Sequence, residues 1–215
     1  MARRGIGMNA RPNTSSADER RRRDRRRRGP RRATPDSLRA AALHYLERYE
    51  SSAAHLRRLL LARVERSART HGTEREEGAA AVDALIAEFL SNGSLDDARY
   101  ARMRALSLHR RGASARAIRR ALAAKGVARE VVTGAIECLE EASAEPELTA
   151  ALNYVRRRRL GPCRAPHARA EMRDRDLAAL GRQGFSYDLA RRVIDAEDLA
   201  ELEAEAGAPP GRVAP

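Results

Sequence analysis

Aromatic and β-branched residues are scarce in this 215-residue sequence. Phe and Tyr together make up 3% of the chain, and Trp is absent. Because aromatic and β-branched residues favour strands, a sheet is not expected. Alanine is abundant instead, and a hydrophobic content of 42% is enough for a core. The composition therefore favours closely packed helices, in a chain with room for one or two ordinary domains.

Long apolar runs and paired cysteines are also lacking. No apolar run approaches the ~20 residues that span a bilayer, so no membrane partner is expected. The arginine-rich start lacks the apolar segment of a secretory signal, and we expect a cytoplasmic protein. Cys138 and Cys163 have no metal-ligand spacing. Cys138 lies beside Ile136 and Leu139 in sequence and is predicted to be a buried, reduced thiol.

The residue patterns of enzymes and metal sites are missing as well. The five histidines form no HExxH motif or other ligand pair, and no glycine-rich phosphate loop is present. Asp96 and Asp97 could suggest a metal pair, but no second carboxylate cluster supports one. The pair suits the start of a helix better. The sequence therefore predicts a protein that is not an enzyme and needs no cofactor or metal.

The clearest structural signals lie between Leu95 and Val127. Asp96 suits a helix N-cap, and Gly112, which follows two arginines, suits the end of that helix. Ser114 can cap a second helix, which Gly126 then closes. The buried face of this second helix is predicted at positions i, i+3 and i+4, namely Ile118, Ala121 and Leu122.

The same unit recurs before and after this stretch. One set of matches has a constant offset of 58 residues: Leu122, Gly126, Val127 and Ile136 match Leu180, Gly184, Phe185 and Ile194. A second set has an offset of 62: Ser52, Leu56, Arg58 and Leu60 match Ser114, Ile118, Arg120 and Leu122. A third has an offset of 50: Val82, Ile86 and Phe89 match Val132, Ile136 and Leu139. The matches predict three copies of a three-helix unit.

Such units stack on their neighbours, so we expect an elongated, curved, all-α body. The predicted repeats span residues 34–94, 95–143 and 144–206, and a loose tail follows over residues 207–215. The first repeat is 12 residues longer, and its second helix is predicted to fray into a polar loop over residues 66–78. Several large apolar residues are assigned to the buried helix faces: Tyr45, Tyr49, Leu59, Leu90, Tyr100 and Tyr154.

Most of the positive charge lies at the N-terminus. The net charge is +13, and residues 1–35 hold 13 arginines and 3 acidic residues, so the rest of the chain carries only +3. Residues 1–33 are too polar and too densely charged to form a core and are predicted to be a disordered arm. The arm could bind nucleic acid. It could equally be a solvated extension, or sequence upstream of another start at Met8.

Clusters of basic residues also mark the ends of the predicted helices. Cations are favoured at helix C-termini by the helix dipole, so these clusters have a structural explanation. Their recurrence in successive repeats could instead place positive charge along one face, where it would suit phosphates or an acidic groove. The candidate partner-binding residues are Arg110, Arg111, Arg116, Arg119, Arg120, Lys125, Arg156 and Arg157.

Residues 95–127 resemble the central repeat of the RecX family, which regulates the bacterial recombinase RecA. The resemblance rests on Leu95-Asp96-Asp97, an aromatic residue at Tyr100, Gly112, and the closing Lys125-Gly126-Val127. The opening repeat is matched by Ala42-Leu43-x-Tyr45-Leu46 and Leu56-Arg57-Arg58. The third is matched by Arg156–Leu160 with Gly161-Pro162 and then Gly184-Phe185-Ser186. The resemblance covers about residues 36–196.

The resemblance implies an all-helical, cytoplasmic and non-enzymatic regulator, which we expect to be a monomer. Members of the family lie in the groove of the RecA filament and suppress its recombinase, ATPase and coprotease activities. They thereby modulate DNA repair by recombination and the SOS response, and some bind DNA directly. The alternative is an independent single-stranded DNA-binding protein that uses the arm and the central basic residues.

Three features depart from the family pattern. The first repeat contains the 12-residue insertion, and the arginine-rich arm lies outside the pattern. In addition, Asp176 occupies the position in the third repeat that corresponds to Ile118, so the helix around it is less well specified by the sequence. These departures affect the edges of the expected binding face more than the fold.

Overall fold

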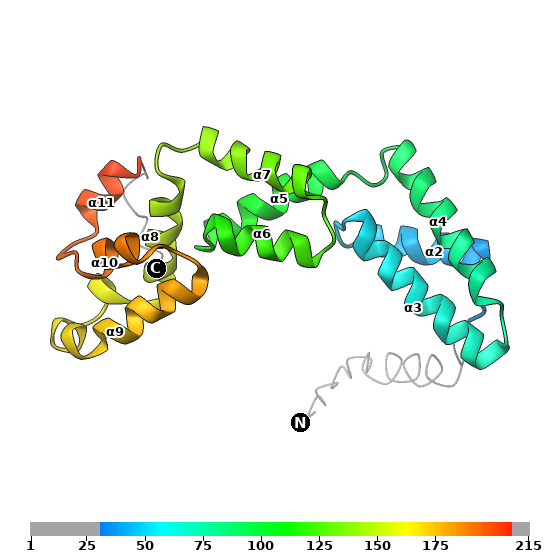
Figure 1. The fold of residues 1–215 in the computed structure, drawn as a ribbon, viewed down its shortest axis with the longest axis horizontal. Helices are drawn as coiled ribbons and strands as arrows, with labels where there is room; N and C mark the ends of the chain where they lie inside the picture. The colour runs from blue at the N-terminus through cyan, green and yellow to red at the C-terminus, as the bar shows by residue number, and fades with distance from the viewer. Residues whose placement is uncertain (1–30, 208–215) are drawn as a thin grey trace, which may run out of the picture.

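The computed structural model describes residues 31–207, and within this range the chain folds into ten α-helices and one short 3-10 helix, with no strand (Figure 1). The predicted all-α fold is therefore confirmed. Residues 1–30 of the predicted arm and residues 208–215 of the predicted tail lie outside the described range. The elements are α2 (Pro35–Leu46), α3 (Ala53–His71), α4 (Arg75–Ser91), α5 (Asp97–Arg110), α6 (Ala115–Ala124), α7 (Arg129–Glu141), α8 (Pro146–Arg158), η1 (Gly161–Cys163), α9 (Pro166–Gln183), α10 (Tyr187–Ile194) and α11 (Ala200–Glu205).

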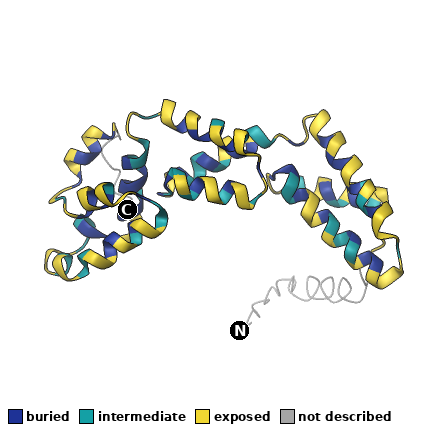
Figure 2. Ribbon diagram, in the orientation of Figure 1, coloured by how far each residue is buried: buried dark blue, intermediate teal, exposed yellow. Residues whose placement is uncertain are grey.

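The helices form three groups that follow one another along an elongated, bent body, as Figure 1 shows. We refer to α2–α4 as the first repeat, α5–α7 as the second, and α8–α11 with η1 as the third. Each repeat has its own cluster of buried hydrophobic residues, and the buried faces in Figure 2 turn toward the inside of each group. Because each repeat buries its own core, the chain presents a long surface to solvent.

The core of the second repeat has the predicted spacing. Ile118 and Leu122 of α6 are fully buried, and Ile136 of α7 is 2% exposed. Leu122 also ends its helix in a Schellman motif, because its carbonyl accepts from the N–H of Val127 while Gly126 adopts a φ of +77°. Leu180, Gly184 and Phe185 form the same motif in the third repeat, which explains why this pattern recurs at a constant offset.

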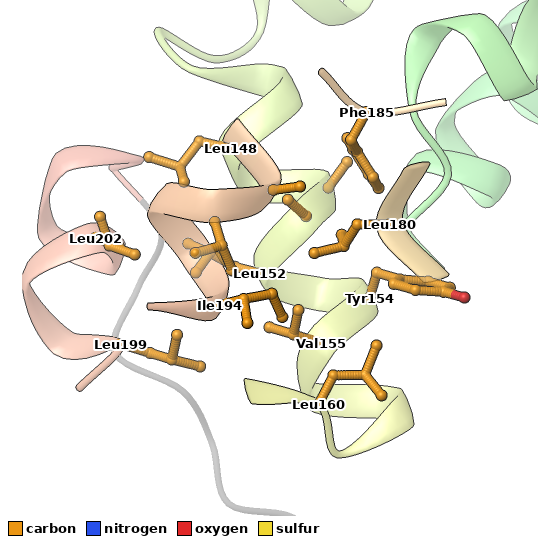
Figure 3. Packing of buried hydrophobic residues seen from close by; sticks show 14 of the residues in the cluster. Leu148, Leu152, Tyr154, Val155, Leu160, Leu180, Phe185, Ile194, Leu199 and Leu202 are labelled. Carbon is orange, nitrogen blue, oxygen red and sulfur yellow. The ribbon is translucent and has the colours of Figure 1, made fainter. Parts of the chain in front are cut away.

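The third repeat has the largest core, and Figure 3 shows its packing. Leu152 and Val155 of α8 meet Leu180 of α9 and Ile194 of α10 within one buried cluster. Helix α11 was not predicted from the sequence as a separate helix. This helix is fixed to the third repeat because Leu199 and Leu202 belong to the same buried cluster. Two ion pairs, Arg156–Glu203 and Arg192–Glu205, also anchor this short helix.

The first and second repeats are joined by two hydrogen bonds at the start of α3. The side chain of Ser52, the N-cap of α3, donates to the carbonyl oxygen of Lys125 over 2.6 Å. The N–H of Ala53 donates to Asp97 Oδ1 over 2.8 Å. Free N–H groups at the start of a helix need partners, and here the neighbouring repeat supplies one.

The second and third repeats are joined in the same way, and we call each such contact a repeat joint. Ser114 Oγ donates to the carbonyl oxygen of Gln183 over 2.6 Å, and the N–H of Ala115 donates to Glu147 Oε1 over 2.6 Å. The serines are related by the offset of 62 and the carbonyls by the offset of 58. The repeated sequence therefore encodes both the helices and the contact that holds successive repeats together.

Close approach between repeats requires glycine at two positions in the second joint. Gly112 has a φ of +84°, and a Cβ there would lie 2.5 Å from the backbone nitrogen of Tyr154. Gly184 has a φ of +95°, and a Cβ there would lie 2.9 Å from Ser114 Oγ. A side chain at either site would be strained by its backbone conformation and would push the repeats apart.

The predicted polar loop over residues 66–78 is wrong. Helix α3 continues to His71 and α4 begins at Arg75, so the extra residues lengthen both helices. Glu65 accepts hydrogen bonds from Arg69 and Arg75, and these hold the pKa of its carboxyl down at about 2. Gly78 lies against Val64, where a Cβ would come within 2.5 Å of a methyl group. Side-chain pairing and close helix packing thus replace the expected fraying.

Several single-residue predictions of burial are also wrong. Cys138 is exposed, because α7 turns its neighbours Ile136 and Leu139 inward and leaves the thiol on the solvent side. Tyr49 lies beyond the end of α2 and is 58% exposed, although Tyr100 and Tyr154 are buried as expected. Leu59 and Leu90, which were also predicted to be buried, are 38% and 46% exposed.

The boundary of the first repeat also differs from the prediction at its start. Ala33, assigned to the arm, donates its N–H to Ser67 Oγ over 2.9 Å and packs against the first core. Thr34 forms the expected cap, in which its side chain accepts from the N–H of Ser37. The contact with Ser67 therefore fixes the entry of the chain into α2.

Candidate partner-binding surface

Most of the predicted basic residues of the second repeat lie on its exposed surface. Arg110 is the last residue of α5 and Arg111 is its C-cap, and both are exposed. Helix α6 buries Ile118 and Leu122 on one side, so the other side carries the remaining arginines into solvent. These exposed residues of α6 are Arg116, Arg119 and Arg120.

A comparison of the first two repeats shows why Arg119 has no ion-pair partner. In the first repeat the corresponding residue, Arg57, forms a bidentate ion pair with Asp83 of α4, at 2.6 and 3.0 Å. The residue of the second repeat that corresponds to Asp83 is Thr133, which has no charge. Within residues 31–207, Arg119 has no carboxylate partner, so its guanidinium is available to a binding partner.

The joint between the second and third repeats gathers three of the candidate arginines. The Arg157 guanidinium of α8 donates to the carbonyl oxygen of Arg111 over 3.3 Å. On the other side of the joint, the side chain of Arg116 lies against Gly184. A Cβ added to Gly184 would lie 3.2 Å from the Cβ of Arg116. Arg111 and Arg157, which are 46 residues apart in sequence, are therefore placed with Arg116 around one contact.

Two other candidates lie in different surroundings. Lys125 belongs to the joint between the first and second repeats, where its Nζ lies 3.3 Å from His55 Nε2. Burial, with Lys125 and Arg58 nearby, lowers the pKa of His55 below its usual value, so this imidazole is neutral near pH 7. Arg156 is paired with the buried Glu203 of α11, which offsets its charge. Arg156 is thus less available than its neighbours.

Two acidic residues and one histidine have structural roles. Asp96 caps α5 by accepting from the N–H of Arg99 over 2.9 Å, as predicted. His109, which belongs to the basic cluster in sequence, is 9% exposed, and its Nε2 lies 2.7 Å from the carbonyl oxygen of Pro146. Asp97 spans the first joint.

The described range contains no group of three or more histidine, cysteine or acidic side chains that could hold a metal ion.

Asp176 is buried because it has partners, although the sequence analysis could only note its mismatch with Ile118. Its carboxylate accepts from Arg164 at 2.6 and 2.7 Å and from the N–H of Gly161 at 2.8 Å. Burial raises the pKa of Asp176, but the hydrogen bonds from Arg164 and Gly161 outweigh it and bring the pKa below its usual value. The ionised carboxylate therefore ties η1 to α9.

The sequence analysis missed two exposed arginines of α9, Arg175 and Arg182. Arg175 lies between Asp174 and Asp176, and Arg182 follows six residues after Asp176, so the segment does not read as a basic run. Their separation of seven residues, which places them on one helix face, was the signal that could have found them.

These features describe an all-α helical repeat protein that carries exposed arginines at the joint between its second and third repeats. No helix within residues 31–207 is both long enough and apolar enough to cross a membrane. A family model described as "RecX, second three-helix domain" matches residues 96–136. This span coincides with most of the second repeat.

Two curated relatives agree with this match. The chain is 48% identical over 168 residues to "Regulatory protein RecX" of Myxococcus xanthus (strain DK1622), which covers 77% of this chain and 88% of the relative. It is 34% identical over 111 residues to "Regulatory protein RecX" of Agrobacterium fabrum (strain C58), covering 49% of this chain and 57% of the relative. The chain belongs to the RecX family of regulatory proteins. No solved structure gave a significant match.

Proposed function

We propose that this protein binds the RecA filament and inhibits its recombinase, ATPase and coprotease activities, and thereby modulates DNA repair and the SOS response. The proposal rests on its membership of the RecX family. The structural observation that carries it is the group of cations around the second joint, Arg111, Arg116 and Arg157, together with the unpaired Arg119 of α6. In this proposal the protein acts in the cytoplasm, as a monomer and without chemistry of its own.

The shape of the protein supports a mode of action that needs no catalytic group. A filament offers the same surface many times, and an elongated body can touch several protomers at once (Figure 1). Several weak contacts made together give avidity without a deep pocket. A protein bound in this way inhibits by blocking the groove of the filament or by favouring a filament state that cannot turn over.

An independent single-stranded DNA-binding protein is the second candidate function. The observation that favours it is the arginine-rich segment of residues 1–33, which carries most of the net charge. A cationic segment attracts phosphates through counterion release, with little sequence preference and a strong dependence on salt. If this function dominated, inhibition of RecA would follow from competition for DNA.

Reversing one charge at the second joint and one on the exposed side of α6 tests the proposed binding surface. The double substitution Arg111→Glu and Arg119→Glu should raise the concentration for half-inhibition of RecA about tenfold, because a like-charge contact replaces an attractive one. Both side chains are exposed, so the helical content should not change. The measurement is the inhibition of RecA-dependent ATP hydrolysis on single-stranded DNA.

A matched control is Arg66→Glu with Arg129→Glu, two exposed arginines of α3 and α7 that lie outside the second joint. This control makes the same change in net charge and should inhibit as the unaltered protein does. Equal loss in both double variants would mean that only overall charge matters. Normal inhibition by a folded Arg111/Arg119 variant would remove Arg111 and Arg119 from the binding surface.

A further inference from the structure

The first joint, between the first and second repeats, contains a histidine that faces two cations. His55 Nδ1 lies 3.2 Å from Arg58 Nη2, and His55 Nε2 lies 3.3 Å from Lys125 Nζ at the end of α6. Charged arginine and lysine side chains carry only hydrogen-bond donors. A neutral imidazole has one nitrogen that can accept from such a donor, whereas a protonated imidazole has none. The arrangement therefore suits the neutral ring and opposes the charged one.

No acidic side chain of the described residues compensates for this arrangement. Burial, Lys125 and Arg58 together lower the pKa of His55, and no carboxylate acts in the opposite direction. Asp97, the carboxylate that spans this joint, accepts from the N–H of Ala53. From α2, the ring of Tyr45 lies edge-on to the imidazole at a centroid distance of 6.4 Å. Protonation of His55 would thus place three positive charges in contact.

The groups around His55 also hold the two repeats together. Arg58 of α3 donates to the carbonyl oxygen of Ala124, at the end of α6, over 3.1 Å. The two segments touch closely beside this bond, because a Cβ added to Gly126 would lie 2.5 Å from the Cβ of Ala54. A charge that appears on His55 therefore appears within the contact that fixes the first repeat on the second.

The second joint lacks the histidine–lysine pair, although the same serine hydrogen bond closes it. By the offsets of 62 and 58 residues, the positions of His55 and Lys125 correspond to Ala117 and Gln183. Neither of these side chains titrates. The hydrogen bond from serine to a backbone carbonyl is present in both joints, so it does not depend on the imidazole. A joint of this kind therefore closes without a histidine, and His55 adds a response that closure does not require.

We propose that the first joint is a pH-sensitive hinge that loosens when His55 is protonated. The imidazolium repels Lys125 and Arg58, the bond from Arg58 to Ala124 is lost, and the angle between the two repeats becomes free to change. Because the closed joint favours the neutral ring, it keeps its full stability above about pH 6.5, the usual pKa of histidine, and loses stability as the pH falls below this value. The proposal concerns the shape of the free protein, so it goes beyond the proposed function.

Energy transfer between dyes on the first and second repeats of the full chain, without RecA, tests the proposal. One dye is attached to the exposed Cys138 of α7 and the other to an introduced cysteine, Arg66→Cys, on α3. Cys163→Ala leaves these as the two reactive thiols. The transfer efficiency should change between about pH 7.5 and about pH 5, with a midpoint below about pH 6.5, while circular dichroism shows a constant helical content.

Two variants take their residues from the second joint. His55→Ala introduces the residue found at position 117 and should abolish the pH-dependent change while keeping the transfer efficiency of the closed joint. Lys125→Gln introduces the residue found at position 183, whose amide oxygen can accept from a protonated imidazole, and should reduce the change by at least about half. The matched control is His167→Ala on α9, an exposed histidine of the third repeat, which should respond as the unaltered chain does.

Three results would overturn the proposal. A transfer efficiency that is the same at both pH values in the unaltered chain would mean that Lys125 and Arg58 turn into solvent while the joint stays closed. An equal change in His55→Ala would assign the response to another group. A loss of helical content over the same pH range would show that a repeat unfolds, rather than that the hinge loosens.

Discussion

The substitution Gly112→Ala is expected to open the joint between the second and third repeats and to abolish most of the inhibition of RecA. At a φ of +84° an alanine is strained by about 1–2 kcal/mol. Its Cβ would also lie 2.5 Å from the backbone nitrogen of Tyr154, and backbone atoms cannot rotate out of the way. The strain is relieved only if α8 moves away from the end of α5.

The expected result is a change in shape rather than general unfolding. Each repeat has its own buried cluster, so the third repeat should keep its helices when the joint opens. Circular dichroism should show nearly normal helical content, and small-angle X-ray scattering should show an altered radius of gyration. Arg111 and Arg157 would separate, and the concentration for half-inhibition of RecA should rise at least about tenfold.

Gly134→Ala in α7 is the matched control for this substitution. Gly134 lies within a helix, and a Cβ there would meet nothing within 4 Å. Alanine is favoured over glycine inside a helix by about 0.5–1 kcal/mol, so this variant should be slightly more stable. If Gly112→Ala matched Gly134→Ala in melting, shape and inhibition, the close contact at the joint would not matter for function.

The substitution Leu122→Ala is expected to destabilise the second repeat by about 2–5 kcal/mol. Leu122 is fully buried and belongs to the cluster that Ile118 and Ile136 complete. Leu122 shares this buried cluster with Val127, and between them in sequence lies the carbonyl of Lys125 that accepts from Ser52. Loss of this side chain should therefore weaken both the core and the first joint.

The melting temperature of the Leu122→Ala variant should fall on the order of 10 °C. The control is Leu43→Ala, which removes the same atoms from a side chain that is 45% exposed on α2. That variant should melt within a few degrees of the unaltered protein. A small effect at Leu122, similar to that at Leu43, would contradict the alignment of the repeats on which the description of the core depends.

The features that could be predicted from the sequence are those set by nearby residues. The capping serines, the glycines that close the helices and the apolar spacing of α6 all act within one or two turns, so their pattern identified the repeats. The lengths of α3 and α4 could not be predicted in this way. Their extension depends on Glu65 pairing with Arg75 and on Gly78 packing against Val64, which are contacts between helices.

The candidate site was predictable only as a set of cations. Sequence spacing shows that Arg116 and Arg119 share a helix, but it cannot show that Arg157 reaches the carbonyl of Arg111. Nor can it show that Glu203 of α11 forms an ion pair with Arg156. The buried Asp176 makes the same point, because an unfavourable residue in the repeat pattern becomes favourable once Arg164 lies beside it.

The inhibition of RecA-dependent ATP hydrolysis in the presence of excess DNA tests the central claim most directly. The assay uses preformed RecA filaments on single-stranded DNA near physiological salt, where binding through the arm is weak. If the protein binds the filament itself, the concentration of protein that gives half-inhibition should rise with the concentration of RecA. Inhibition should also persist when free single-stranded DNA is added in tenfold excess. Full relief of inhibition by the added DNA would contradict the account and show that the protein only competes for DNA.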